Sequence, residues 1–286
     1  MGLWLQLFAF DVIGEVTFSQ RFGLMDIGKE SDVIKQIKNV LKSTSWVGQV
    51  PYIYKIHQLL SPIVGNRLSL TARNGSLRQF TADQVQSRVL RGSDHRDMLG
   101  RFLEINKAKP IDFDEAALLS MTASNVAAGS DTTAISLRSM LYYLLKGSRC
   151  MQKLVTEIEK TTEGMPPYSV VTYEQATAMP YLQAVMNEAM RIHSIVGHSM
   201  QRVVPREGIQ IGQYYIPSEV IIGTSPYVLG RSEGIYGPDA KTFRPERWLE
   251  DGKKYDLCYL AFGGASRLCI GKSNGNPLDE GAFGND

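Results

Sequence analysis

Near its end the 286-residue chain carries Phe262-Gly263-Gly264-Ala265-Ser266-Arg267-Leu268-Cys269-Ile270-Gly271, which combines one thiol, one guanidinium and several glycines. A thiolate that binds a metal must be kept deprotonated. Glycines let the backbone turn tightly, so amide N–H groups can approach the sulfur and tune the metal behind it. Arg267 adds a permanent positive charge, and Phe262 adds a flat apolar face. These residues, called the cysteine loop below, predict a metal site at Cys269. A lone cysteine is also often just a small buried hydrophobe.

The cysteine loop resembles the cysteine-ligand loop of the cytochrome P450 haem-thiolate monooxygenases. That pattern runs Phe, two residues, Gly, one, Arg, one, Cys, one, Gly, and four positions match: Phe262, Arg267, Cys269 and Gly271. Ala265 stands where the family has Gly, which adds a methyl group close to the cofactor. The resemblance implies that Cys269 is the axial ligand of haem b (iron protoporphyrin IX), with Phe262, Arg267 and Gly271 beside the cofactor.

A second motif lies inside a long predicted helix. Asp112 is expected to cap this helix and Glu115 to reach back to the cap. From there to Leu145 only Gly129 interrupts the helical pattern, so the helix should be about 50 Å long. The segment 128–133, Ala-Gly-Ser-Asp-Thr-Thr, is rich in poor helix formers, whose presence inside a helix suggests a functional groove. A kinked helix with a satisfied threonine is the alternative.

In the P450 family an oxygen-binding groove lies at a segment of this pattern. The resemblance implies that Gly129 opens space beside the cofactor and that Thr132 holds dioxygen and the water that protonates it. Asp131 would relay protons inward as a general acid–base group. We call residues 128–133 the threonine segment.

A third motif joins two separate stretches. Glu188 and Arg191 are three apart on a predicted helix that begins at Pro180, so their side chains share a face. Taken alone, they would make a surface salt bridge worth under about 1 kcal/mol. The family joins such a pair to an arginine of a Pro-Glu-Arg segment, here Arg247. The resemblance implies a structural bracket of Glu188, Arg191 and Arg247 that locks the chain ahead of the cysteine ligand.

The remaining periodicity predicts helices over 29–46, 51–70, 77–90, 97–106, 148–164 and from 180 onward. The period then changes to two, and apolar residues between 209 and 222 predict a small antiparallel sheet. Arg202 opens this region, and by resemblance it pairs with a haem propionate. The expected fold is mainly α with a small antiparallel β-sheet (α+β).

Several function classes are disfavoured by composition. A formal net charge of +2 is too small to argue for nucleic-acid or anionic-membrane binding. Cys150, Cys258 and Cys269 are odd in number and include no Cys-x-x-Cys pair, which argues against a disulfide framework or structural zinc. No run of about 18 apolar residues predicts a transmembrane helix. The apolar start, 1–18, lacks a basic region and resembles a core helix more than a signal peptide, with Trp4, Phe8 and Val12 at helical spacing.

We therefore expect an incomplete cytochrome P450 fold of the fungal membrane type, truncated at both ends. Residues 1–271 would form the C-terminal portion of the domain, and 272–286 an irregular or disordered tail. Family members of this type are usually anchored to the endoplasmic reticulum by an N-terminal anchor absent from this chain, so its localisation stays open.

Two functions remain open. The first is a haem-dependent monooxygenase that inserts one oxygen atom from O2 into a small lipophilic substrate, as in fungal secondary metabolism, with electrons from a separate flavoprotein reductase. The second is an inactive truncated remnant of such an enzyme that does not retain haem.

Overall fold

The computed structural model describes residues 1–47, 52–53, 55–56, 59–60, 76–93 and 95–273. The chain divides into two compact units, Met1–Ile135 and Ser136–Asp286. The described residues are mainly helical with short antiparallel strands, which confirms the expected fold class. None of their helices is both long enough and apolar enough to span a bilayer.

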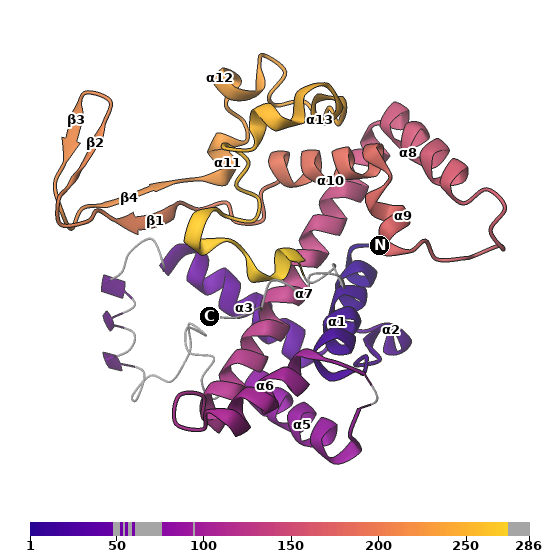
Figure 1. The fold of residues 1–286 in the computed structure, drawn as a ribbon, viewed down its shortest axis with the longest axis vertical. Helices are drawn as coiled ribbons and strands as arrows, with labels where there is room; N and C mark the ends of the chain where they lie inside the picture. Colours follow the sequence, from indigo (N-terminus) through magenta and orange to yellow (C-terminus); the bar gives the residue numbers. More distant parts are fainter. Residues whose placement is uncertain (48–51, 54, 57–58, 61–75, 94, 274–286) are drawn as a thin grey trace. The chain divides into compact units, whose positions relative to one another are not determined.

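The first unit is built from helices (Figure 1). Their bounds are α1 Gly2–Phe18, α2 Leu24–Ile27, α3 Asp32–Val47, α5 Ser76–Arg91, α6 Met98–Ala108 and the first part of α7 Glu115–Lys146. Most of these agree with the predicted helices to within two or three residues. The predicted helix 51–70 lies largely outside the described residues.

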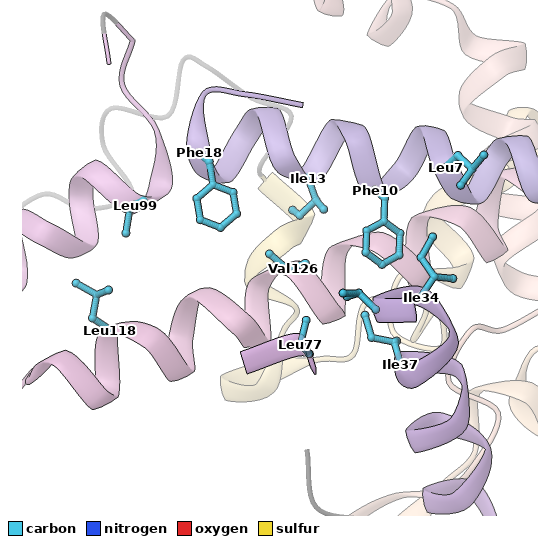
Figure 2. Packing of buried hydrophobic residues seen from close by; sticks show 11 residues of the cluster. Leu7, Phe10, Ile13, Phe18, Ile34, Ile37, Leu77, Leu99, Leu118 and Val126 are labelled. Atoms are coloured by element: carbon cyan, nitrogen blue, oxygen red, sulfur yellow. The ribbon is translucent and has the colours of Figure 1, made fainter. Parts of the chain in front are cut away.

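The core of this unit forms between α1 and the helices packed against it. Figure 2 shows Phe10 and Ile13 pointing from α1 toward Val126 of α7, with Ile34 and Leu77 closing the cluster. Phe10 is only 1% exposed. Burying an aromatic side chain of this size stabilises a fold by about 2–3 kcal/mol.

The helical prediction for residues 1–18 is confirmed, but the face it suggested is wrong. Trp4 and Phe8 are 47% and 44% exposed and Val12 is also exposed, whereas Phe10 and Ile13 are buried. Apolar residues occur on nearly every side of α1, so spacing alone could not select the buried face. Contacts with α3, α5, α6 and α7 select it instead.

Helix α7 is 32 residues long, or about 48 Å at the α-helical rise, close to the predicted length. Its predicted cap is wrong. Asp114, not Asp112, accepts a hydrogen bond from the backbone N–H of Ala117 at 2.7 Å. Asp112 lies in the turn that precedes α7, too far before the helix for its carboxylate to accept from the unpaired backbone N–H groups of the first helical turn.

The second unit continues α7 and adds short helices and strands. Their bounds are α8 Ser148–Thr161, α9 Tyr173–Thr177, α10 Pro180–Ile192, β1 Met200–Val203, β2 Ile209–Ile211, β3 Tyr214–Ile216, β4 Ile221–Thr224, α11 Pro226–Leu229, α12 Glu233–Tyr236, α13 Glu246–Asp251, and the 3-10 turns η2 Gly252–Tyr255, η3 Ala265–Arg267 and η4 Ile270–Ser273. Helix α10 begins with Pro180 in its first turn, as predicted.

The predicted small sheet is antiparallel but divided. Within the described residues β1 pairs only with β4, with Met200 opposite Thr224, and β2 pairs only with β3 in a hairpin (Figure 1). Gly212 opens the two-residue hairpin loop with φ of 57°, a conformation that favours glycine. The predicted tail lies outside the described residues from position 274 onward.

Candidate functional site

The cysteine loop is closed by its own backbone. The N–H of Cys269 donates to the carbonyl of Phe262 at 2.8 Å, and the N–H of Arg267 donates to the carbonyl of Gly264 at 3.2 Å. Gly263 has φ of 79°, and a Cβ there would stand 2.8 Å from the Arg267 carbonyl oxygen. Only glycine meets both demands, which gives this position a physical reason independent of any ligand.

The closed loop presents the Cys269 side chain. Cys269 is exposed and free, while Cys150 and Cys258 are partly buried. In the described part of the chain, no group of three or more His, Cys, Asp or Glu side chains converges on a common point. A haem takes its in-plane nitrogens from the macrocycle and an axial ligand from the protein, and a cysteine thiolate is one residue type that serves. The exposed free thiol of Cys269 is compatible with that role.

Four other predicted cofactor residues, Phe262 among them, lie in the same unit as Cys269. Arg267 and Gly271 are exposed in the turns η3 and η4. Arg202 is exposed on β1, where its Nη1 donates to the carbonyl of Gln201 at 2.7 Å. Each arginine thus keeps a solvent-facing cation that could bind an anionic group.

The threonine segment lies in the first unit and stays helical throughout. The Thr132 hydroxyl donates to the carbonyl of Ala128 one turn back, at 2.6 Å. Asp131 accepts a hydrogen bond at 2.9 Å from Nε2 of Gln6, a fully buried side chain of α1. Gly129 packs against the side chain of Ile13. The α-helical conformation continues through this segment. Helix α1 contacts Gly129 through Ile13 and binds the Asp131 carboxylate through Gln6.

The bracket is a buried cluster in the second unit. Glu188, Arg191 and Arg247 are at most 2% exposed. Arg191 holds both carboxylate oxygens of Glu188, with Nε–Oε2 of 2.8 Å and Nη2–Oε1 of 2.7 Å. Arg247 Nε reaches Oε1 at 3.1 Å across 59 residues of sequence. The Glu188–Arg191 ion pair is therefore buried, and it is not the surface salt bridge that the spacing of the two residues alone would suggest.

Further donors complete the carboxylate's shell. The backbone N–H of Arg244 donates to Oε1 of Glu188 at 2.8 Å, and the indole N–H of Trp248 donates to Oε2 at 3.0 Å. Neither contact was predicted from the sequence. Their only signal was proximity to Arg247 in the stretch 243–248.

The remaining guanidinium N–H groups are satisfied by backbone carbonyls. Arg191 donates to Gly230, to Ala240 at 2.7 Å and to Thr242 at 3.2 Å. Arg247 donates to Tyr236 at 3.0 Å and to Asp239 at 3.1 Å. These bonds tie α10 and α13 to the segment 230–242, which includes α12, so the bracket fixes backbone as well as charge.

Charge partners keep Arg247 and its neighbour Asp239 ionised. Burial alone would lower the pKa of Arg247, but the carboxylates of Glu188 and Asp239 outweigh burial and raise it. Burial would raise the pKa of Asp239, but Arg247 and Arg244 outweigh it and lower that pKa. Both partners therefore stay charged at neutral pH, and the cluster contains no uncompensated buried charge.

Aromatic rings connect the bracket to the chain ahead of the cysteine loop. The ring of Trp248 lies 5.4 Å from that of Tyr255 and 4.9 Å from that of Tyr259, both in edge-on contact. Tyr255 stacks on Tyr236 at 4.7 Å. Because Tyr259 is three residues before Phe262, this cluster holds the entry to the cysteine loop.

Comparison with known proteins gives one consistent family. The cytochrome P450 family model matches residues 1–273. The chain is similar to cytochrome P450 monooxygenase hepC of Aspergillus oryzae (37% identity, 95% of this chain, 56% of the relative). It is also similar to cytochrome P450 monooxygenase cicH of Emericella nidulans (34%, 95% and 56%) and to a cytochrome P450 monooxygenase of Aspergillus terreus (35%, 95% and 57%). The chain thus spans about half the length of these relatives.

Proposed function

Because this chain belongs to the cytochrome P450 family, we propose that it carries the cysteine-ligand portion of a haem-dependent monooxygenase. The observation that carries the proposal is the closed cysteine loop. The hydrogen bond from the Cys269 N–H to the Phe262 carbonyl closes the loop, and the Cys269 thiol is exposed and free. Cys269 would be the axial ligand of haem b. When bound, a haem with a thiolate ligand supplies the activation of O2 that leads to O–O cleavage.

The residues around the haem would have distinct tasks. Arg202 and Arg267 would neutralise its propionate carboxylates, since both cations face solvent. Phe262, Gly271 and Gly129 would shape the space against the macrocycle. These proposed tasks concern binding and orientation of the cofactor.

Proton supply would fall to the threonine segment. Thr132 donates its own hydroxyl proton to Ala128, so its oxygen can accept a hydrogen bond from a water molecule. Asp131, held by Gln6, would pass protons inward. The bracket of Glu188, Arg191 and Arg247 would position the chain ahead of Cys269 and would not take part in the chemistry.

The substrate would be a small lipophilic molecule that receives one oxygen atom. Electrons would come from a separate flavoprotein reductase. An inactive remnant that does not retain haem is the competing outcome, and one measurement separates the two.

The test is the spectrum of the reduced, carbon monoxide-treated chain. The full 286-residue chain is expressed with a haem precursor, reduced and exposed to carbon monoxide. A strongly red-shifted Soret band is expected, because a thiolate ligand donates electron density to the iron. Cys269→Ser should abolish this band, whereas Cys150→Ser, at a partly buried cysteine outside the loop, should keep it. A folded chain that takes up no haem would establish the remnant instead.

A further inference from the structure

A small cavity lies beside the bracket, entirely within the second unit. Its volume is about 10 Å³, and its lining includes Arg191, Ser194, Tyr236, Cys258 and Tyr259. Arg191 lies on α10 and Ser194 follows that helix, Tyr236 ends α12, and Cys258 and Tyr259 lie in the segment that leads into the cysteine loop. None of them belongs to the haem-binding set described above, and Arg191 belongs to the bracket.

Two phenol hydroxyls in this lining lack a protein partner. The Oη atoms of Tyr236 and Tyr259 are buried and form no hydrogen bond with any described residue. Buried hydroxyls in native proteins are almost always paired, either with protein or with ordered water. Burial raises the pKa of Tyr236 to about 12 and raises that of Tyr259 as well, so both phenols stay protonated. Each hydroxyl can therefore donate one hydrogen bond and accept others.

The size and the charge of the cavity restrict its occupant. A volume of about 10–15 Å³ holds one water molecule, and a water needs two to four polar partners. The two phenols supply two partners, and the Ser194 hydroxyl, which donates to the carbonyl of Val196 at 3.1 Å, can accept from a third direction. Arg191 disfavours a metal cation, and its own charge is matched by Glu188. An organic ligand is too large.

We propose that this cavity is a binding site for one internal water molecule that bridges the hydroxyls of Tyr236 and Tyr259. The water accepts a hydrogen bond from one phenol O–H and donates one to the oxygen of the other, so that each hydroxyl gains a partner. It thereby joins α12, whose Tyr236 carbonyl already accepts from Arg247, to the chain three residues ahead of the cysteine loop. The two hydroxyls and Ser194 are not among the residues proposed to bind haem, so the water site and the haem site are tested separately.

Tyrosine-to-phenylalanine exchanges test whether the two hydroxyls stabilise the folded chain. Unfolding of the full chain by urea is compared for Tyr236→Phe, Tyr259→Phe and the double variant. A bridged hydroxyl predicts that each single exchange raises the unfolding equilibrium constant about fivefold, the factor that corresponds to one hydrogen bond. Because both exchanges remove the same bridge, the unfolding equilibrium constant of the double variant should rise by less than the product of the two single-variant factors. Tyr255→Phe is the control, since Tyr255 belongs to the same ring cluster but does not line the cavity.

Two outcomes overturn the proposal. If either single exchange leaves the equilibrium constant unchanged or lowers it, that hydroxyl is unpaired in the folded chain. If the two losses multiply fully, no shared water links them. Nuclear magnetic resonance on the unaltered chain gives a second readout that does not depend on variants folding. The slowly exchanging hydroxyl protons of Tyr236 and Tyr259 should both show cross-relaxation with a long-lived water molecule. If neither shows this cross-relaxation, the proposal is also overturned.

Discussion

The Cδ1 atom of Ile13 lies 2.6 Å from the position that a Cβ atom would take on Gly129. The two residues are 116 positions apart and bring α1 and α7 into contact without a side chain between them. Ile13 belongs to the buried cluster of the first unit (Figure 2). The glycine inside α7 therefore has a packing role of its own, beside the role proposed for it at the haem.

This contact predicts the effect of Gly129→Ala. Alanine favours a helix by about 1 kcal/mol over glycine, but the added methyl group must displace Ile13 from a packed core, at about 1–3 kcal/mol. We expect a net loss of stability in urea unfolding. In an Ile13→Val background, which removes the Cδ1 atom, the same change should cost less. Strictly additive losses would show that the contact does not limit this position.

The bracket predicts a large and specific loss for Glu188→Gln. The exchange keeps the shape of the side chain but leaves Arg191 and Arg247 without their shared buried anion. Removing one partner of a buried ionic cluster costs about 3–5 kcal/mol, so the urea midpoint should fall sharply. The exposed pair of Glu233 and Lys241 gives the control: Glu233→Gln should change stability by less than about 1 kcal/mol. Equal effects of the two exchanges would contradict the structural role of the bracket.

A second buried ion pair predicts acid sensitivity of the first unit. Burial alone would raise the pKa of Asp97, but bonds from Arg88, from the Gly100 N–H and from Ser19 outweigh it and lower that pKa. A lowered folded pKa stabilises the fold above the unfolded value, near pH 4, and this stabilisation is lost as the pH falls below it. Asp97→Asn should thus be clearly less stable than the unaltered chain at pH 7.

The pH dependence distinguishes this charge effect from simple loss of packing. The stability difference between the two proteins should shrink as the pH is lowered from 5 toward 2, measured by urea unfolding at each pH. Asp26→Asn, at an exposed carboxylate paired with Arg21, should show only a small difference at any pH. A difference for Asp97→Asn that stays constant across this range would mean that its charge does not matter.

The start of α7 predicts unequal effects for two neighbouring aspartates. Asp114 accepts the Ala117 N–H, so Asp114→Ala should cost about 0.5–2 kcal/mol of stability. Asp112 lies outside the helix, and Asp112→Ala should stay within about 0.5 kcal/mol. Thermal unfolding followed by circular dichroism would resolve this difference. The reverse order would restore Asp112 as the cap.

Much of the architecture could be predicted from local pattern. The pattern predicts a helix over 77–90, and α5 ends at Arg91. It is followed by Gly92 with φ of 76°, because glycine is the usual residue after a helix C-terminus. The family could be predicted from the cysteine loop, since a short motif brings several rare residue types together at set spacings. The cap of α7 could not be chosen correctly, because Asp112 and Asp114 both suit a cap and only the start of the helix separates them.

The bracket shows where prediction had to rely on resemblance. The spacing of Glu188 and Arg191 indicates only a shared helix face, and nothing local says whether that face is buried. Arg247, 59 residues later, reaches the same carboxylate because the chain folds back on α10. The Trp248 N–H had no signal beyond its place beside Arg247, and the buried hydroxyls of Tyr236 and Tyr259, which have no partner among the described residues, had none. The partners of an aromatic side chain depend on its tertiary neighbours.

By itself, the sequence determined the family and the helical class, and it singled out Cys269 as the candidate ligand, because these depend on motifs and periodicities that neighbouring residues carry. Only the tertiary structure decided which face of α1 is buried, that Ile13 fills the space over Gly129, and that Glu188 is shared by two arginines. The physical reason is that burial and ion pairing arise between segments distant in sequence, where packing in three dimensions selects among faces that the local pattern leaves equivalent.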